Sequence, residues 1–204
     1  MQKLSFTLLL FIGTLFSLKA ATPVRFKLVY NNATSKYEVY MNSTTAFTGN
    51  PNRLISSGQV TIVVPTGTGA AQFQPTSITG GTGGGATAMS WTMTRANAPT
   101  ENTSKDYILF EYSASANPSV SFDIPANTDV LLFSFSNSGT CPSSPIALIN
   151  NTNDPFIFPN SQSLQTANGI TIYGNGGDAY ASNLSGNVAC AVVSCAANAG
   201  VLSR

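Results

Sequence analysis

Short runs of alternating or continuously apolar residues, separated by turn sequences, recur along the chain and constrain its fold most strongly. Strict apolar and polar alternation is typical of a β-strand with one buried face, whereas Gly, Pro, Asn and Asp between such runs favour turns. No window of eleven or more residues has a convincing helical period. The pattern predicts an all-β fold, an antiparallel β-sandwich of jelly-roll type with about nine to eleven strands. We expect strands at 24–30 and 37–41, which form a hairpin. Further strands are expected at 57–65, around Phe73, and at 88–94, 105–114, 119–124, 129–136, 145–149 and 169–173.

The most apolar run after the N-terminal segment is 129–136, with the sequence DVLLFSFS. It lies between turn residues on both sides, and we expect it to be the central strand on which the others pack. Alternation predicts that Leu131, Phe133 and Phe135 face the core and that Val130 and Leu132 lie on the opposite face.

The first twenty residues are typical of a secretory signal peptide. Lys3 supplies a positive start, 4–18 is an apolar run, and the small residues Ala20 and Ala21 offer a cleavage site. The run is short for a transmembrane helix, and no second apolar run of membrane length follows. We therefore expect export to the extracellular space or cell surface, no integral membrane span after cleavage, one β-sandwich domain at 21–190, and a C-terminal tail at 191–204. This tail is either disordered or donates a strand to a neighbouring sheet edge.

Charged residues make up only 8% of the chain. Removal of Lys3 and Lys19 with the signal peptide leaves seven basic and eight acidic residues, a net charge of 7 − 8 = −1. This balance argues against nucleic acid as a partner. The chain has no histidine to activate a serine and no recognisable pair of catalytic carboxylates, so we expect no enzyme activity.

The three cysteines, Cys141, Cys190 and Cys195, leave two pairings open. A Cys141–Cys190 disulfide would close a long loop and contribute about 4 kcal/mol on the loop-entropy argument. A Cys190–Cys195 disulfide would close a small local loop instead. A metal site is not expected, because the chain lacks histidine and a Cys-x-x-Cys motif.

Two kinds of binding residue are candidates. Asp154 and Asp178 lie in Asn-rich and Gly-rich segments and offer oxygen ligands for calcium, although turn formation by Asx side chains explains them more simply. No other cofactor is expected. Aromatic residues of the expected strands, above all Trp91 and Tyr180, are candidates for glycan stacking, although such residues more often pack in a core.

Four segments together resemble a known type of surface protein. They are SGQVTIVVPTG (57–67), RANAPTENTSKDYILF (95–110), VLLFSFSNSGTC (130–141) and GNGGDAY (174–180). In this order they resemble the N-terminal domain of large adhesin-like cell-surface proteins of gliding-type bacteria and, more remotely, a cohesin-type β-sandwich. The resemblance covers about residues 22–190 and implies export, a sandwich fold, a role in surface attachment or assembly, and pairing of Cys141 with Cys190.

These observations favour a non-catalytic secreted or cell-surface β-sandwich that acts in adhesion or as a subunit of an extracellular assembly, such as a filament or surface layer. Its expected partners are other copies of itself, surface proteins or glycans. The alternative is a carbohydrate-binding module, and a hydrolase is the third hypothesis.

Overall fold

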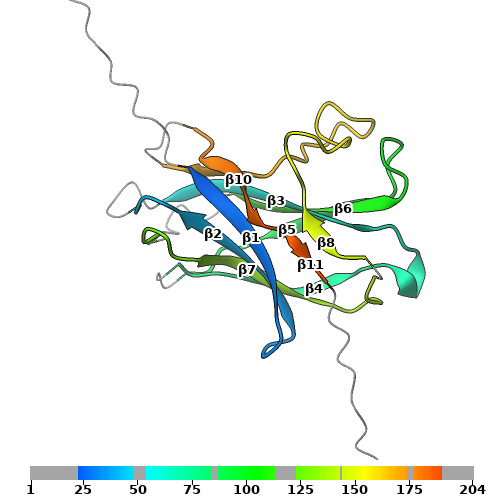
Figure 1. Cartoon of the computed structure of the whole chain (residues 1–204), viewed down its shortest axis with the longest axis horizontal. Coiled ribbons are helices and arrows are strands. Elements are labelled where there is room, and N and C mark those ends of the chain that lie inside the picture. Colours follow the sequence, from blue (N-terminus) through cyan, green and yellow to red (C-terminus); the bar gives the residue numbers. More distant parts are fainter. Residues whose placement is uncertain are drawn as a thin grey trace, which may run out of the picture.

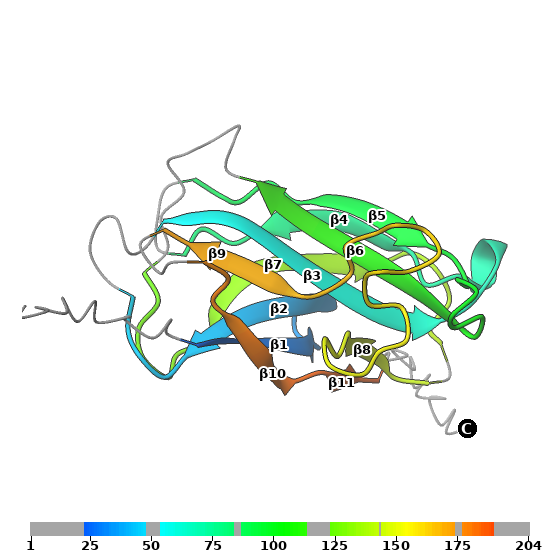
Figure 2. The same ribbon diagram turned by 90° about the horizontal axis from the view of Figure 1, so that it is seen from above.

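The computed structural model describes residues 23–47, 54–83, 87–113, 123–142, 144–173 and 177–189. In this part of the chain, eleven strands form two sheets that pack face to face (Figure 1, Figure 2). The predicted β-sandwich is thereby confirmed. The predicted signal peptide at 1–20 and the tail at 191–204 lie outside the described residues.

The first sheet has five strands in the order β10-β1-β2-β7-β4. β1 and β2 form the predicted hairpin, and β7 and β4 continue the antiparallel pairing. β10 lies parallel to β1 at the edge of the sheet. The bounds are β1 (Val24–Asn31), β2 (Lys36–Ser43), β4 (Pro75–Gly80), β7 (Val130–Asn137) and β10 (Tyr180–Ser185).

The second sheet has the order β11-β8-β3-β6-β5, and β9 also pairs with β3. β3 is 11 residues long, and pairs with β6 along one edge and with β8 and β9 in succession along the other. The run 129–136, predicted as the central strand, forms β7, which is an interior strand between β2 and β4. The strand with the most partners is β3 instead. The bounds are β3 (Ile55–Pro65), β5 (Thr92–Ala96), β6 (Lys105–Ser113), β8 (Ile146–Leu148), β9 (Gly169–Ile172) and β11 (Asn187–Val188).

The inner faces of the two sheets enclose one continuous core of aliphatic and aromatic side chains. Phe110 on β6 contacts Phe133 and Phe135 on β7, with ring centroids 4.7 and 5.2 Å apart. Tyr37 on β2 stacks on Phe135. Burial of each such side chain stabilises the fold by about 1.5–3 kcal/mol. Because this core fixes one sheet against the other, it also fixes the positions of the side chains on their outer faces.

A bulge in β7 changes which side chains enter the core. Val39 pairs with Phe133 and Tyr40 pairs with Leu131, so Leu132 is an extra residue between the two pairs. Leu132 is fully buried and joins Phe133 in the core, while Leu131 is partly exposed. Val130 packs against the core with Leu132. The predicted orientations of Val130, Leu131 and Leu132 were wrong, because simple alternation does not anticipate a bulge.

Several strand boundaries differ from the predicted ones. Phe73 lies between the short 3-10 helix η1 (Gly69–Ala71) and β4, and Trp91 precedes β5. Ile124 forms an isolated bridge with Phe47, and the rest of the predicted strand at 119–124 lies outside the described residues except for Asp123. β10 and β11 follow the last strand that the sequence predicts.

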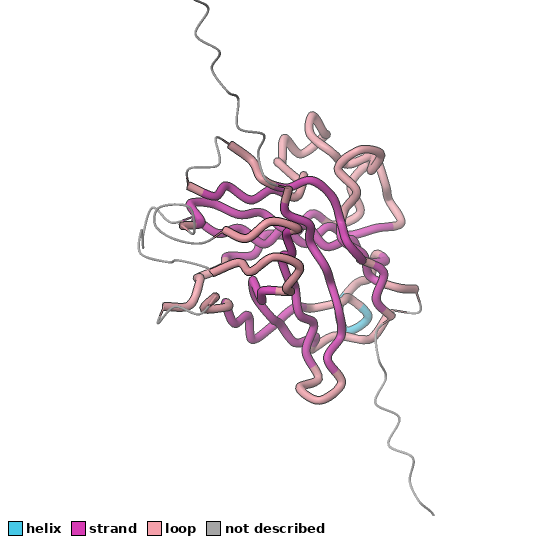
Figure 3. Tube along the Cα trace, turned by 60° about the vertical axis from the view of Figure 1, so that its left-hand side comes forward, coloured by secondary structure: helices cyan, strands magenta, loops and turns pink. Residues whose placement is uncertain are grey.

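A loop, 149–168, connects β8 to β9 and covers part of the outer face of the second sheet (Figure 2). Phe156 from this loop is buried against Tyr107 on β6, with ring centroids 4.7 Å apart, and belongs to a second, smaller core. Asn160 stabilises the loop from within, because its Nδ2 donates to the carbonyl oxygens of Phe156 and Leu164 at 3.0 and 2.8 Å. Strands make up most of the body, and irregular segments of this kind lie around it (Figure 3).

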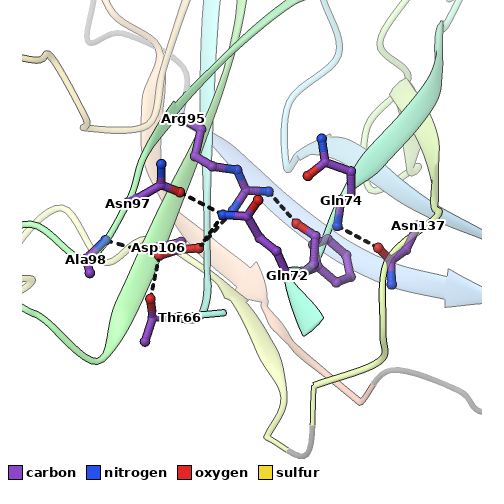
Figure 4. A network of polar contacts seen from close by, with 9 residues as sticks. Thr66, Gln72, Gln74, Arg95, Asn97, Ala98, Asp106 and Asn137 are labelled. Carbon is purple, nitrogen blue, oxygen red and sulfur yellow. Dashed lines mark hydrogen bonds and ion pairs between the residues drawn. The ribbon is translucent and has the colours of Figure 1, made fainter. Parts of the chain in front are cut away.

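A buried polar network lies where β5 and β6 meet the segment around η1 (Figure 4). Asp106 is fully buried, and its carboxylate accepts hydrogen bonds from Arg95 Nη1 at 3.0 Å and Thr66 Oγ1 at 2.9 Å. Arg95 Nη2 donates to the carbonyl oxygen of Phe73. Burial lowers the pKa of Arg95, and the charge of Asp106 acts in the opposite direction. The network therefore connects the segment before β4 to the second sheet.

Candidate functional site

The part of the second sheet that the loop 149–168 leaves open contains a groove of about 650 Å³. It lies over β9, β3, β6 and β5, and its lining includes side chains from all four strands or from residues next to them. The groove is not apparent from the sequence, because its residues come from separate segments of the chain.

Strand register arranges the groove side chains in two rows. In the first row Gln59 lies opposite Gly169 on one side and Glu111 on the other, and Glu111 lies opposite Thr92. In the second row Ser57 lies between Thr171 and Ser113. Residues adjacent to these along the strands, Val60, Phe110, Tyr112 and Ile170, are buried in the core. The row residues therefore point outward, as the alternation of a β-strand requires.

The end of the loop 149–168 forms one side of the groove. Gln59 Nε2 donates to the carbonyl oxygen of Gln165, and Asn168 is buried at the base of the loop. Asn168 Oδ1 accepts from the backbone nitrogen of Thr61 at 2.8 Å, and its Nδ2 donates to the carbonyl oxygen of Ile149 at 3.1 Å. One part of β3 pairs with β9 and another with β8, and Thr61 lies between these two parts. The Asn168 side chain therefore bonds to the β3 backbone where neither strand does.

Asp178 lies at the β9 side of the groove. Its Oδ1 accepts from the backbone nitrogen atoms of Ile170 at 2.8 Å and Tyr180 at 2.9 Å. A Cβ atom at Gly169 would lie 3.3 Å from Asp178 Oδ2. Glycine at this position therefore leaves room for the carboxylate.

Glu111 differs from the other acidic residues. It is exposed, and within the described residues no hydrogen bond or ion pair of its carboxylate is found. The remaining seven of the eight acidic residues of the chain each have an interaction in the fold. Glu111 is therefore the acidic side chain of the described part that is available for a ligand.

No protein-family model, curated protein or solved structure matches this chain. The site must therefore be interpreted from its own geometry. Among the described residues, no helix is long and apolar enough to cross a membrane.

The predicted stacking residues do not form an exposed aromatic surface. Trp91 is only 8% exposed, its ring packs on Phe133 with centroids 4.6 Å apart, and its Nε1 donates to the carbonyl oxygen of Leu132. The stacking alternative is therefore corrected for Trp91, which is a core residue. Tyr180 is half-buried against Phe26, its hydroxyl donates to Asn183 Oδ1 at 2.8 Å, and burial raises its pKa.

A different aromatic residue is open to solvent. Tyr173, which directly follows β9, is 59% exposed. Ile172 before it is buried in the core, so Tyr173 projects to the outer face, as does Thr171 in the second row of the groove. An aromatic ring therefore lies at the β9 side of the same face.

The calcium candidates Asp154 and Asp178 use carboxylate oxygen atoms in local hydrogen bonds. Asp154 Oδ1 accepts from the backbone nitrogen of Phe156 and from the hydroxyl of Tyr107, each at 2.9 Å. Both aspartates thus bond to a backbone nitrogen two residues ahead, which is the Asx-turn chemistry expected of them. Within the described ranges, no three His, Cys, Asp or Glu side chains cluster as a metal site would require.

The predicted Cys141–Cys190 disulfide stays a prediction, because Cys190 lies outside the described residues. β11 nevertheless brings the chain close to the Cys141 segment. Val188 at its end pairs with Ile146 at the start of β8, and Leu148 donates to the carbonyl oxygen of Gly186 at 3.1 Å.

The outer face of the first sheet has a charged arrangement. Lys27 Nζ lies 2.5 Å from Asp129 Oδ2, and Asn42 Nδ2 donates to Asp129 Oδ1 at 2.9 Å. The hydrogen bond from Lys27 lowers the pKa of Asp129, more than desolvation raises it. These charged groups bind one another across β1, β2 and the start of β7, so they offer less to a ligand than Glu111 does.

We expect Asp129→Asn to lower the free energy of unfolding at about pH 7 by less than about 1 kcal/mol, since the ion pair is about one-third exposed to solvent. The folded-state pKa of Asp129 is below its ordinary value of about 3.9. The stabilisation of the folded state by the ion pair is therefore present above that value and is lost as the pH falls through the folded-state pKa. Urea unfolding at about pH 7 and about pH 2 measures the difference. A difference that persists at the lower pH would show that Asp129 acts through packing rather than charge.

Proposed function

We propose that this chain is a non-catalytic, exported β-sandwich that acts in adhesion or as a subunit of an extracellular assembly. The main support for this proposal is that most acidic side chains of the described residues serve as structural hydrogen-bond acceptors. Asp106, Asp129, Asp154 and Asp178 accept hydrogen bonds that hold strands and loops together. With no histidine in the chain, such groups support a binding surface better than a proton-transfer site.

Open sheet edges support the assembly form of this proposal. β5 is an edge strand without proline, and Thr92 and Thr94 on it are exposed. β4 at the edge of the other sheet begins with Pro75 and has a register shift between Thr76 and Thr79. Proline and bulges protect an edge from pairing, so β5 is better suited to accept a strand from another copy.

The N-terminal segment with signal-peptide character supports export. The four segments that resemble adhesin-like surface proteins support a role at the cell surface, and a Cys141–Cys190 disulfide would suit an oxidising environment. A carbohydrate-binding module is the second candidate. The groove over β3 and β6 with exposed Tyr173 beside it favours that candidate.

We expect the oxidised mature protein, residues 21–204, to associate as its concentration rises, because its small net charge opposes association little. Sedimentation velocity and negative-stain electron microscopy measure this. Thr94→Lys should weaken association by placing a charge on the β5 edge, whereas Thr34→Lys, in the exposed turn between β1 and β2, is the matched control. Monomers at every concentration would contradict the assembly form, and hydrolytic turnover that survives purification would contradict the non-catalytic character.

A further inference from the structure

We propose that the groove over β9, β3, β6 and β5 binds a neutral glycan chain, with Glu111 as its polar centre and Tyr173 as a stacking platform at its β9 side. This inference rests on the non-catalytic, surface-binding function proposed above and names a ligand class and residues for it. The site differs from the one that the sequence suggested, because Trp91 is a core residue.

The groove has the hydrogen-bonding character that sugar hydroxyls require. Its two rows present the hydroxyls of Ser57, Thr92 and Thr171 and the amide of Gln59. Hydroxyl groups both donate and accept hydrogen bonds, as sugar hydroxyls do. The short side chains and Gly169 leave the floor low, so that a broad ring can approach the sheet.

Charge selects between neutral and acidic glycans. Among the described residues, the groove lining contains the carboxylates of Glu111 and Asp178, and none of its residues is Lys or Arg. A carboxylate accepts hydrogen bonds from neutral hydroxyl groups more strongly than an uncharged acceptor does. It repels uronate and sulfate groups. The ligand that fits this lining is therefore a neutral sugar chain.

Glu111 is placed to contact such a chain. It lies between Gln59 and Thr92 in the first row. The Glu111 carboxylate therefore has the amide of Gln59 on one side and the hydroxyl of Thr92 on the other. Since no partner of this carboxylate is found in the described part of the chain, binding requires no existing contact to break.

Tyr173 supplies the apolar contact. A sugar ring has faces formed by C–H groups, and these faces pack favourably on an aromatic ring. Tyr173 is the most exposed large hydrophobic side chain of the described residues, at 59%, and it projects to the same outer face as Thr171. A glycan chain that crosses the sheet along the second row would end at Thr171, and Tyr173 lies two residues further along the polypeptide on the same outward side.

The backbone beneath the groove argues against an extended peptide as the ligand. Peptides that bind sheets gain much of their affinity from the unpaired backbone groups of an edge strand. The middle of the groove lies over β3 and β6, which are interior strands with a neighbour on each side, and β9 and β5 form its two sides. A ligand there must be recognised by side chains, and those present match hydroxyl groups.

Affinity electrophoresis of the oxidised mature protein tests the proposal. The native gels contain mixed-linkage β-glucan, xyloglucan, glucomannan or dextran as neutral polysaccharides, and alginate or polygalacturonate as acidic ones. We expect at least one neutral polysaccharide to retard the protein and neither acidic one to do so. Glu111→Gln and Tyr173→Ala should each weaken that binding at least about tenfold. Phe158→Ala is the matched aromatic control, because Phe158 is 47% exposed and lies in the loop 149–168, outside the groove lining.

Thermal melts show whether each variant is folded. Glu111→Gln should have the melting temperature of the wild type, because the Glu111 carboxylate makes no hydrogen bond or ion pair with another described residue. Absence of retardation by every neutral polysaccharide would overturn the glycan site, as would equal retardation of the wild type and both groove variants. Binding of a protein ligand that Glu111→Gln and Tyr173→Ala both abolish, with no neutral polysaccharide bound, would overturn it too. A different result would contradict the proposed function. If the protein shortened a polysaccharide during the assay, it would not be non-catalytic, although the groove would still be a glycan site.

Discussion

Asp106→Ala is expected to lower the free energy of unfolding by about 3–5 kcal/mol, the usual cost of removing one partner of a buried ion pair. The carboxylate of Asp106 is fully buried, and Arg95 beside it is only 12% exposed. Without Asp106, the guanidinium keeps its bond to the carbonyl oxygen of Phe73 but loses its counter-charge. Urea unfolding of the variant and the wild type measures the difference.

The loss should extend beyond the ion pair, because Asp106 also accepts hydrogen bonds from three other groups. They are Thr66 Oγ1 at 2.9 Å, the backbone nitrogen of Ala98 at 3.1 Å and Gln72 Nε2 at 3.3 Å. Ala98 has a φ angle of 38°, which is unfavourable for a residue with a Cβ atom. The hydrogen bond from the backbone nitrogen of Ala98 to Asp106 helps to hold this turn (Figure 4), so removal of the Asp106 carboxylate leaves both an unpaired charge and a strained backbone.

A double-mutant cycle with Arg95→Met separates the pair from the rest of the network. Asp106→Ala combined with Arg95→Met should cost less than the sum of the single variants, because neither charge then remains buried alone. Glu111→Gln is the matched control, with an expected change within about 0.5 kcal/mol for a surface carboxylate. A loss below about 1 kcal/mol for Asp106→Ala would contradict a stabilising role of the network.

Alternation in the sequence predicted the regular strands well. In β6 it separated Ile108, Phe110 and Tyr112, which enter the main core or line it, from Tyr107 and Glu111 on the other face. It predicted the β1–β2 hairpin for the same reason. Such segments are predictable because one face of each strand is buried along its whole length.

Elements that depend on contacts distant in sequence were not predictable in the same way. The bulge at Leu132 and the late strand β10, which pairs parallel to β1, have no local signal. Asn168 occurs in a polar segment that resembles an ordinary turn, yet its side chain completes the pairing of β3 at Thr61. These features follow from how the sheets meet rather than from the preferences of single segments.

In the groove, too, some features follow from the local sequence and others from contacts distant in sequence. The exposed position of Glu111 follows from the alternation in 105–114, but its neighbours Gln59 and Thr92 are set by the register of three strands. Trp91 was a candidate for glycan stacking because it is the only tryptophan of the chain. It lies just before β5, however, and its ring packs in the core. A sequence can thus mark an outward residue without showing which other outward residues lie beside it.

Cys141→Ser is expected to lower the free energy of unfolding of the oxidised protein by about 4 kcal/mol, if Cys141 pairs with Cys190. The closed loop would restrict the unfolded chain, and by the usual scaling the melting temperature should fall by about 10 °C. In the folded state, the bridge would hold β11 against β8. β11 has only 2 residues, with pairs at Ile146 and Ala147, so its own pairing stabilises it little.

Thermal melts with and without reductant measure this effect. Cys190→Ser should behave like Cys141→Ser, both should match the reduced wild type, and Cys195→Ser is the matched control that should leave the oxidised melting temperature unchanged. If instead Cys195→Ser is destabilising and Cys141→Ser is not, the local Cys190–Cys195 bridge is present. In that case no disulfide holds β11 against β8, and its described contacts are its two backbone pairs, the bond from Leu148 to Gly186 and the packing of Val188 on the core.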